Sequence, residues 1–210
     1  MGIISSGIKT GLAMRYDAEH KQKTREKVLD AAAAAIRLDG PHKVGVAGIM
    51  AEAGLTHGGF YAHFESKDDL VAQAISHMFD QSAARRLQQM EGRPPGEALS
   101  VYIDFYLSEG HRDARTQGCA LPALAADLPR LPPAAQESFS AGMRQMTAIL
   151  AEKICGLGRA DPDDLASSMI AELVGALGLA RAEPDRARSN LMLERSKRVL
   201  KQRLGLEAFQ

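Results

Sequence analysis

VAGIMAEAGLTHGGFYAHFESK, the segment Val46–Lys67, contains two short apolar runs separated by a glycine. Val46, Ile49 and Met50 recur at helical spacing, which predicts a short amphipathic helix. Gly54 follows and supplies the left-handed backbone conformation that a tight turn needs. The pattern predicts two short helices joined by a turn, the arrangement of a helix-turn-helix.

The second of these helices begins at Thr56, whose hydroxyl is placed to accept a hydrogen bond from a backbone N–H two or three residues further on. Its first turn contains His57, Gly58 and Gly59. In helix-turn-helix proteins this end of the second helix faces the base edges of the major groove. Two glycines there would let the backbone itself approach the groove closely. We therefore interpret the segment as a DNA-reading element.

The tail of the second helix, FYAHFESK over residues 60–67, resembles the TetR/AcrR family of transcriptional regulators. Members of that family share an aromatic or Leu, Tyr, any residue, His, Phe, a short linker and Lys at this place, and the match is gapless. The resemblance implies that one set of residues faces the major groove: Thr56, His57, Gly58 and Gly59. It also implies that Phe60 and Phe64 lie in the core and that a further set contacts phosphates: Tyr61, His63 and Lys67.

The chemistry of the last three side chains supports phosphate contacts independently. A phenol and an imidazole are hydrogen-bond donors, and lysine is a point charge. Contacts of this kind position a protein on DNA without reading its sequence. Many relatives carry Ser, Lys or Gln where this chain has Gly58 and Gly59, so direct base contacts fall chiefly to Thr56 and His57. The alternative is that the tyrosine and the second histidine are ordinary surface or half-buried residues.

The composition is that of a soluble globular protein with room for two domains. The chain has 210 residues, of which 45% are hydrophobic and 25% charged, and these are ordinary values. That length suits one small domain and a larger one with its own core. The longest apolar stretches, Ala31–Ala35 and Leu173–Ala180, are far shorter than the ~20 residues that a membrane-spanning helix needs. We therefore expect no membrane partner.

The formal net charge is +0, which argues against a protein that coats nucleic acid through bulk electrostatics. Through Lys67, nine basic residues stand against seven acidic ones. Four of the basic residues cluster just ahead of the first predicted helix: Lys21, Lys23, Arg25 and Lys27. We expect residues 1–23 to form a flexible arm that lies along phosphates or enters a minor groove. A solvated basic helix start is the alternative.

The two cysteines, Cys119 and Cys155, show no paired spacing to histidines. This pattern excludes a zinc finger and argues against a disulfide framework. We expect no metal site and no cofactor, and a reducing, cytoplasmic setting fits best. The sequence also argues against an enzyme, because it contains no Gly-rich phosphate loop, no G-x-S-x-G elbow and no HExxH motif.

Helical periodicity continues through the rest of the chain, so the predicted fold class is all-α. The first helix covers Thr24–Leu38 and ends at Gly40 and Pro41, which stop a helix. A long helix over Asp68–Met90 leads into a series of further helices, predicted over residues 97–109, 121–128, 133–155, 163–183 and 185–204. We predict a flexible arm over 1–23, a three-helix DNA-binding domain over 24–67, and a helical regulatory and dimerisation domain over 68–210.

Small residues at intervals of four, three and four share one face of helix 163–183 and permit a second helix to approach closely: Ala171, Gly175, Gly178 and Ala182. The last helix adds Leu191, Val199 and Leu200. These two helices and their symmetry mates could form a four-helix interface, which the family resemblance also implies. We therefore predict a homodimer that reads two half-sites. Packing within one subunit is the alternative.

The resemblance further implies that the C-terminal helices enclose a pocket for a small molecule, whose binding changes the spacing of two DNA-reading heads. The candidates for lining it are apolar residues with a few hydroxyls, as is usual in ligand sites: Met78, Phe79, Tyr102, Phe105, Tyr106, Cys119, Phe139, Met143 and Met146. Ordinary core packing is the alternative for each of them.

Cys119 lies in QGCALPAL, residues 117–124. This segment resembles a GC-x-L signature in a subset of these regulators, some related to the N-ethylmaleimide reductase repressor, in which the cysteine senses electrophiles. The neighbouring glycine suggests an accessible thiol, and Arg112 and Arg115 lie close in sequence, where they could favour the reactive thiolate. The alternative is a small buried hydrophobe.

Together these features predict a DNA-binding transcriptional regulator, specifically a ligand-responsive repressor that binds a palindromic operator as a homodimer and releases it when a small-molecule inducer binds. Its partners would be double-stranded DNA, an unidentified inducer and a second copy of the chain. Two alternatives stay open. One is a helical protein-binding adaptor that merely retains the head, and the other is a repressor that senses electrophiles or oxidants through Cys119.

Overall fold

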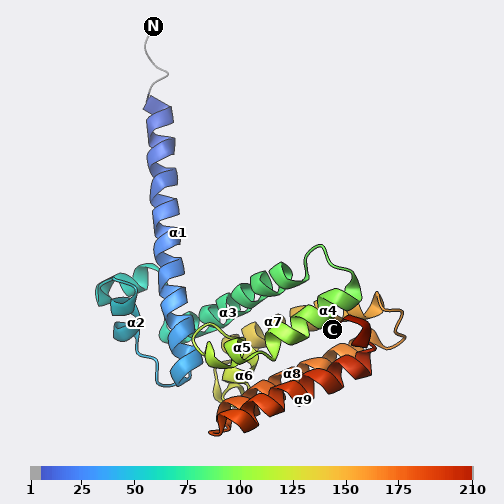
Figure 1. Cartoon of the computed structure of the whole chain (residues 1–210). Helices are drawn as coiled ribbons and strands as arrows, with labels where there is room; N and C mark the ends of the chain where they lie inside the picture. The colour runs from blue at the N-terminus through green and yellow to red at the C-terminus, as the bar shows by residue number, and fades with distance from the viewer. Residues whose placement is uncertain (1–5, 210) are drawn as a thin grey trace.

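The computed structural model describes residues 6–209, with side chains described over residues 19–208. All its regular elements in this range are helical, which confirms the predicted all-α fold class. In chain order they are α1 (Ser6–Asp39), α2 (Val46–Glu52), η1 (His57–Ala62), α3 (Lys67–Met90), α4 (Pro95–Tyr106), α5 (Glu109–Asp113), α6 (Ala120–Leu124), η2 (Leu128–Arg130), α7 (Pro133–Cys155), α8 (Pro162–Ala182), α9 (Arg186–Leu204) and η3 (Glu207–Phe209). Figure 1 shows a small head, made of α1, α2 and η1, beside a larger helical body.

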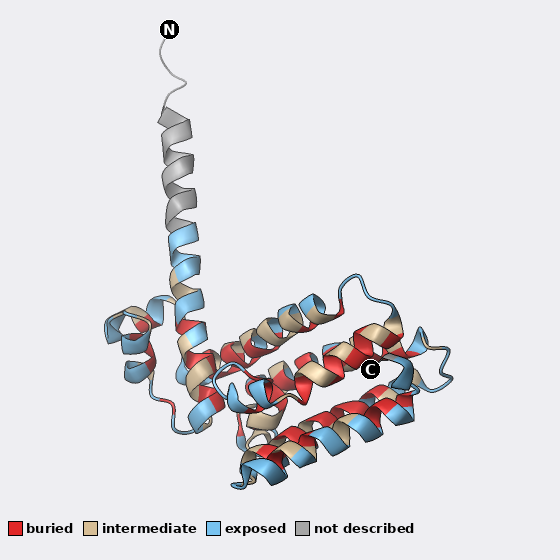
Figure 2. Cartoon of the chain, viewed as in Figure 1, coloured by how far each residue is buried: buried red, intermediate tan, exposed pale blue. Residues whose placement is uncertain are grey.

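The head is held together by apolar side chains from all three of its helices. Val28 and Ile36 of α1 are fully buried, and Ile49, Met50 and Phe60 join them in one hydrophobic core. Figure 2 shows that α1 has buried positions in the part of the helix that lies beside α2 and the body. Burial of this apolar surface stabilises a short helix such as α2, which would not persist alone.

Gly54 makes the turn between α2 and η1, as the sequence predicts. Its φ is +73°, in the left-handed region that is costly for a residue with a side chain. The Leu55 N–H then donates to the Met50 carbonyl at 2.8 Å, which closes the end of α2. The turn therefore determines where η1 starts relative to α2.

α1 begins much earlier than predicted. It is continuous over Ser6–Asp39. The expected flexible arm over residues 1–23 is therefore helical from residue 6 onward, and the prediction is wrong there. Residues 1–5 lie outside the described residues. The part of this stretch with described side chains contains neither glycine nor proline, and Gln22 donates to Glu26 at 2.8 Å across one turn. Good helix formers and contacts of this kind extend a helix.

α3 connects the head to the body as one helix of 24 residues, about 36 Å long. Ser66 caps its start, because its hydroxyl accepts a hydrogen bond from the Asp69 N–H at 3.0 Å. The Asp69 carboxylate in turn accepts from the Glu65 N–H at 3.0 Å, which fixes the chain just ahead of the helix. Lys67, the residue that resembles a phosphate anchor, is thus the first residue of the helix that enters the body.

In the body, α7 packs on α3 and on α8, and α8 packs on α9. α8 is long and apolar enough to span a membrane by length and composition alone. Its Met169, Leu173 and Leu177 are nevertheless fully buried among the neighbouring helices. The apolar character of α8 is therefore that of a core helix.

α3 and α7 approach each other closely at Gly142. The Phe79 ring lies over this glycine, and a Cβ added there would stand 2.2 Å from the ring. Phe139 packs edge-on against Phe79, with the ring centroids 5.6 Å apart. A side chain at position 142 would therefore force the two helices apart or displace the ring.

A buried histidine fixes the irregular segment between α4 and α6. The Nδ1–H of His111 donates to the Tyr106 carbonyl at 2.8 Å, and its Nε2 accepts from the Cys119 N–H at 3.2 Å. The second bond requires the neutral imidazole, because a protonated Nε2 cannot accept, and burial lowers the pKa of His111 to about 4. Arg181 of α8 also donates to the His111 carbonyl at 3.0 Å, which ties the segment to the rest of the body.

Gly142→Ala should destabilise the protein by about 2 kcal/mol, because the new methyl group overpacks the Phe79 ring. The measurement is the free energy of unfolding in urea at a fixed protein concentration. Gly48→Ala is the matched control, since Gly48 lies exposed on α2 with open space at its Cβ position. Alanine there should gain up to about 1 kcal/mol of helix propensity. Equal stability of the two variants would contradict the packing described above.

Acid should weaken the fold through His111. Its pKa is about 4 in the folded protein and 6.5 for an unperturbed histidine. Its contribution to stability is therefore fully present above pH 6.5 and is lost as the pH falls towards 4, by about 3 kcal/mol in total. Unfolding titrations across this range should show a flatter profile for His111→Gln than for wild type, while the exposed control His42→Gln keeps the wild-type slope. Parallel profiles for all three proteins would rule the effect out.

Candidate nucleic-acid interface and regulatory cavity

η1 and the residues just after it place two phenylalanine rings in the core and present polar side chains to solvent. Phe60 and Phe64 are buried, as predicted, and their rings stack with centroids 5.6 Å apart. Between them in sequence, Tyr61 is 73% exposed. His57 and Lys67 are exposed as well. The buried aromatic pair thus orients η1 so that its donors and its cation face outward.

The first turn of η1 differs from the prediction in one respect. The Thr56 hydroxyl caps nothing, because η1 is a 3-10 helix and the Thr56 carbonyl accepts the Gly59 N–H at 3.1 Å, the i to i+3 pattern. Thr56 remains exposed. Gly58 has open space where a Cβ would stand, a Cβ on Gly59 would be 3.7 Å from Met50, and neither has a positive φ. The fold itself therefore does not require either glycine.

His63 is half-buried beside α1. Burial, with Lys21 and Arg25, lowers its pKa. Arg25 also lies over the Phe64 ring, 5.0 Å from the centroid, and hydrogen-bonds to Gln73 of α3. Lys21 and Arg25 belong to the basic cluster that we expected near a flexible arm. Both lie on the helix α1, close to His63, the histidine predicted to contact a phosphate.

A polar network joins the head to the body. Asp30 of α1 accepts from Gln81 of α3 at 2.8 Å, and His77 lies 2.7 Å from the same carboxylate. Arg37, also on α1, donates to Gln81 at 2.9 Å and to the Thr116 carbonyl at 3.2 Å. Thr116 belongs to the loop that leads into α6. The head helix therefore holds part of the body directly.

The body contains a small cavity between α3, α4 and the loop before α6. Four of the nine residues predicted to bind a ligand line it, namely Tyr102, Phe105, Tyr106 and Cys119, together with Ser82, Arg85, Arg86 and His111. Its volume is about 20 Å³, room for about one water molecule. In this conformation the cavity is closed to a larger molecule.

The other five residues predicted to bind a ligand lie elsewhere. Met78, Phe79, Phe139 and Met146 are buried, and Met143 is 40% exposed on α7. Long apolar side chains at helical spacing fill a core as readily as they line a pocket. Only the arrangement of the helices distinguishes a core residue from a pocket residue. Here it places four of these five side chains in the core.

Cys119 is buried, in contrast to the accessible thiol that the neighbouring glycine suggested. Gly118 is buried too, and a Cβ there would stand 2.7 Å from Arg181. This glycine therefore permits close packing against α8 and does not expose the thiol. Among the described residues, no group of three or more His, Cys, Asp or Glu side chains is placed to hold a metal ion.

The arginines predicted to favour the thiolate are not the ones near it. Arg112 is buried, where it donates to Ser189 at 2.9 Å, and Arg115 is exposed. The guanidinium groups that interact electrostatically with Cys119 come from three other elements: Arg37, Arg85 and Arg181. Proximity in sequence failed as a guide here because α1, α3 and α8 converge on the cysteine.

Most of the residues predicted at a dimer interface lie on the surface of α8 and α9. The exposed ones are Ala171, Gly175, Ala182, Leu191 and Val199, and Gly178 is half-buried. Leu200 is fully buried, so its assignment to the interface is wrong. Successive side chains on a helix point in directions about 100° apart. Val199 is exposed, and Leu200, the next residue, points into the core. Leu179 of α8, 61% exposed, is an apolar surface residue that the sequence analysis missed.

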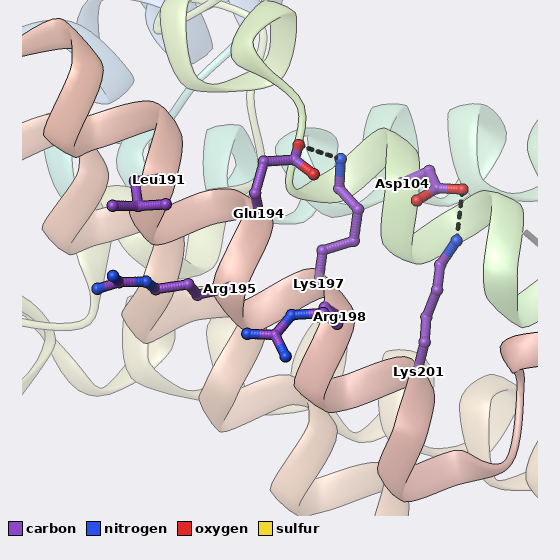
Figure 3. A pocket seen from close by; sticks show the side chains of 7 residues that line it. All are labelled: Asp104, Leu191, Glu194, Arg195, Lys197, Arg198 and Lys201. Atoms are coloured by element: carbon purple, nitrogen blue, oxygen red, sulfur yellow. Dashed lines mark hydrogen bonds and ion pairs between the residues drawn. The ribbon is translucent and has the colours of Figure 1, made fainter.

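A charged groove of about 560 Å³ runs between α4 and α9. Figure 3 shows the almost fully buried Lys201 paired with Asp104 at 2.7 Å. Arg195 and Arg198, drawn in the same view, form no ion pair with any described residue. The groove also contains Leu191, so basic charge borders the surface predicted to meet a second subunit.

Four of the eight cavity residues were not predicted from the sequence, and two of them, Arg85 and Arg86, are charged. Each follows a residue of the apolar stripe of α3 by two helical turns, Met78 and Phe79 respectively. A pair of charged residues in phase with an apolar stripe is the signal that could have revealed them, since charged side chains are rarely buried unless paired.

Residues 28–74 match the family model described as bacterial regulatory proteins of the tetR family. Two curated relatives from Bacillus subtilis (strain 168) are similar. The HTH-type transcriptional regulator YfiR is 27% identical over 102 residues, 49% of either chain. The HTH-type transcriptional regulator YvdT is 32% identical over 95 residues, 42% of this chain and 47% of the relative. The chain thus matches about half the length of both relatives.

Solved structures resemble the chain over the body as well as the head. The reduced form of E. coli NemR has a TM-score of 0.76 at 19% identity, covering 86% of this chain and 96% of NemR. A TetR transcriptional regulator from Chloroflexus aurantiacus J-10-FL has a TM-score of 0.76 at 25% identity, covering 89% and 96%. Residues 28–74 thus match the DNA-binding domain of the tetR family of bacterial regulatory proteins, and the described chain shares the all-α fold of a TetR transcriptional regulator.

Proposed function

We propose that this regulator is a ligand-responsive repressor that binds a palindromic operator as a homodimer. The observation that carries the proposal is the outer surface of η1. His57 and Tyr61 are exposed there and Lys67 is exposed at the start of α3, while Phe60 and Phe64 are buried beneath. We expect it to act in the cytoplasm without a cofactor, as a regulator and not as an enzyme.

In this proposal, the first turn of η1 meets the base edges. The side chains of Thr56 and His57 would make the direct contacts, and Gly58 and Gly59 would let the backbone approach the groove. The open space around the Cβ position of Gly58 supports this role, because the fold gives no reason of its own for a glycine there. A backbone that lies near DNA would supply such a reason.

The phosphate contacts would come from Tyr61, His63 and Lys67. Tyr61 and Lys67 are exposed and His63 is half-buried. A phosphate next to His63 would favour the imidazolium, against the burial, Lys21 and Arg25 that lower its pKa in the free protein. Such contacts fix the register of the head on DNA and leave the choice of sequence to the first turn of η1.

The second subunit would bind on the exposed faces of α8 and α9. Small residues at Ala171 and Gly175 would let two helices approach closely, and Leu179, Leu191 and Val199 would be covered. Each of these three apolar side chains is at least 47% exposed in the single chain. Two heads joined in this way would read two half-sites of one palindrome.

The release of DNA would depend on the connection between the cavity and the head. α3 runs from Lys67 to the cavity, and Arg37 of α1 holds the Thr116 carbonyl in the loop beside it. A ligand that moves this loop would move α1 and α3 together and change the spacing of the heads. A coupling of only a few kcal/mol is sufficient for such a switch.

Sensing of electrophiles through Cys119 is a second candidate function. The observation that favours it is the set of guanidinium groups around this thiol, from Arg37, Arg85 and Arg181. Burial of the thiol opposes it, because a reactive cysteine must be reached by its reagent. The helix-turn-helix match favours DNA binding over the protein-binding adaptor.

Lys67→Ala should weaken operator binding about equally for all sequences and lower the slope of log K against log salt by about 1. Tyr61→Phe should weaken binding by roughly tenfold, without a change of sequence preference, because one hydrogen bond to a charged group is lost. His57→Ala should instead alter the preferred sequence. These quantities are measured by mobility shift on sites selected from random DNA at several salt concentrations.

Arg130→Ala, an exposed cation in η2 of the body, is the control for loss of charge alone and should leave the salt slope unchanged. If Lys67→Ala and Arg130→Ala behave alike, the phosphate role of Lys67 is wrong. If random DNA yields no selected site for the wild-type protein, the regulator does not read DNA in the way proposed.

Leu179→Glu should convert the dimer to a monomer, because it places a charge in an apolar interface. Sedimentation equilibrium measures the oligomeric state, and the affinity for a full palindrome should fall to that for a single half-site. Leu87→Glu is the matched control, since Leu87 is 60% exposed on α3, away from α8 and α9. Dissociation by both variants, or by neither, would overturn the assigned interface.

A further inference from the structure

Arg86 is a buried cation without a protein counter-charge. It is only 4% exposed, its Nε has no hydrogen-bond partner, and no described carboxylate forms an ion pair with it. The Tyr102 side chain lines the same cavity as the guanidinium and interacts with it, but a phenol carries no charge to balance it. A guanidinium stripped of water is costly unless it is paired, so an anion from outside the chain would be a favourable partner.

The cavity next to Arg86 offers hydrogen-bond donors and positive charge. Its lining includes Arg85 and Arg86 but no Asp or Glu. The buried Tyr106 hydroxyl has no hydrogen-bond partner of normal geometry. Burial raises the pKa of Tyr106 and of Tyr102, so both phenols stay protonated. A group with negative charge and acceptor oxygens is the chemical complement of this lining.

Arg86 also lines a groove of about 330 Å³ between α3 and α7, which has the size of a small ligand site. Leu87, Met90 and Ile149 give this groove an apolar surface, and its lining also includes two acidic and two further basic residues: Glu91, Glu152, Arg93 and Lys153. Leu87 is 60% exposed there. Arg86 borders both the cavity and the groove. A ligand with its apolar part in the groove could therefore place a polar group next to the hydrogen-bond donors of the cavity.

We propose that Arg86 is the anion-recognition residue of the effector site, and that the effector is a small carboxylic acid with an apolar body. The carboxylate would bind the Arg86 guanidinium and accept from the Tyr106 hydroxyl. The apolar body would lie against Leu87, Met90 and Ile149. This inference rests on the proposed ligand-responsive function and names the chemical class of the inducer.

The site is also placed to act on the head. Arg85, the neighbour of Arg86, donates to the Gln117 carbonyl at 2.6 Å, one residue from the Thr116 carbonyl that Arg37 holds. A carboxylate at Arg86 would attract Arg85 as well and weaken its bond to the loop. The loop would then lose one of the two arginines that fix it.

The test compares acids with their uncharged amides on the full-length wild-type protein. Benzoate and hexanoate are the probes, benzamide and hexanamide are the controls, and binding is measured by titration calorimetry. The acids should bind at least roughly tenfold more tightly than the amides, since a charged hydrogen-bonded pair forms only with the acids. Equal binding of acids and amides, or no binding of either acid at millimolar concentration, would overturn the proposal.

Two variants of Arg86 locate the site. Arg86→Met removes the charge but keeps the length, and such a replacement of a buried charge is commonly neutral or stabilising, so its thermal unfolding temperature should match or exceed that of wild type. It should lose acid binding by at least roughly tenfold, and Arg86→Lys should retain part of it. Arg93→Met is the matched control at the rim of the groove, where Arg93 pairs with Glu97. Loss of acid binding in Arg93→Met but not in Arg86→Met would place the anion elsewhere.

DNA binding without any acid is measured in parallel. A wild-type protein that selects DNA but ignores the acids would refute only the effector class. A protein that binds the acids but selects no DNA would refute the proposed regulatory function and leave the anion site standing.

Discussion

Burial of Phe60 and Phe64 is the constraint on which the proposed DNA-facing surface depends. Both rings lie in the core of the head, and Tyr61, which directly follows Phe60 in the 3-10 helix η1, then points outward. The positive φ of Gly54 sets where this element begins. The exposed chemistry of the head is thus a consequence of hydrophobic packing and of one backbone turn, because polar groups occupy the positions that the core cannot accept.

The same head is tied to the body by the continuous helix α3 and by polar contacts of α1, among them those of Arg37. α3 carries Lys67 at its first residue and Arg86 near its end, so one rigid element spans the distance between the proposed phosphate contact and the proposed effector site. Arg37 supplies the second tie, through its bonds to Gln81 and to the Thr116 carbonyl. Two independent connections make it difficult for the loop beside the cavity to move without a response from the head.

Much of the fold was predictable because glycine and proline mark the ends of its helices. Pro133–Cys155 and Arg186–Leu204 lie within one residue of the predicted ranges, since a helix start at proline and a stop at glycine are local backbone effects. The start of α1 was not predictable in this way, because no such residue precedes Thr24 within the charged segment. The buried pair in the head was predictable from the resemblance of one short motif.

By itself, the sequence determined the helical class and the turn at Gly54, and it indicated the side chains that we propose face DNA, because these depend on local periodicity and on contiguous residues. Only the tertiary structure decided that Leu200 is core and that Arg86 is buried without a counter-charge. It also decided which arginines surround Cys119. These properties depend on contacts between helices far apart in the chain, and the spacing of residues along one helix carries no information about what the next helix brings to its side.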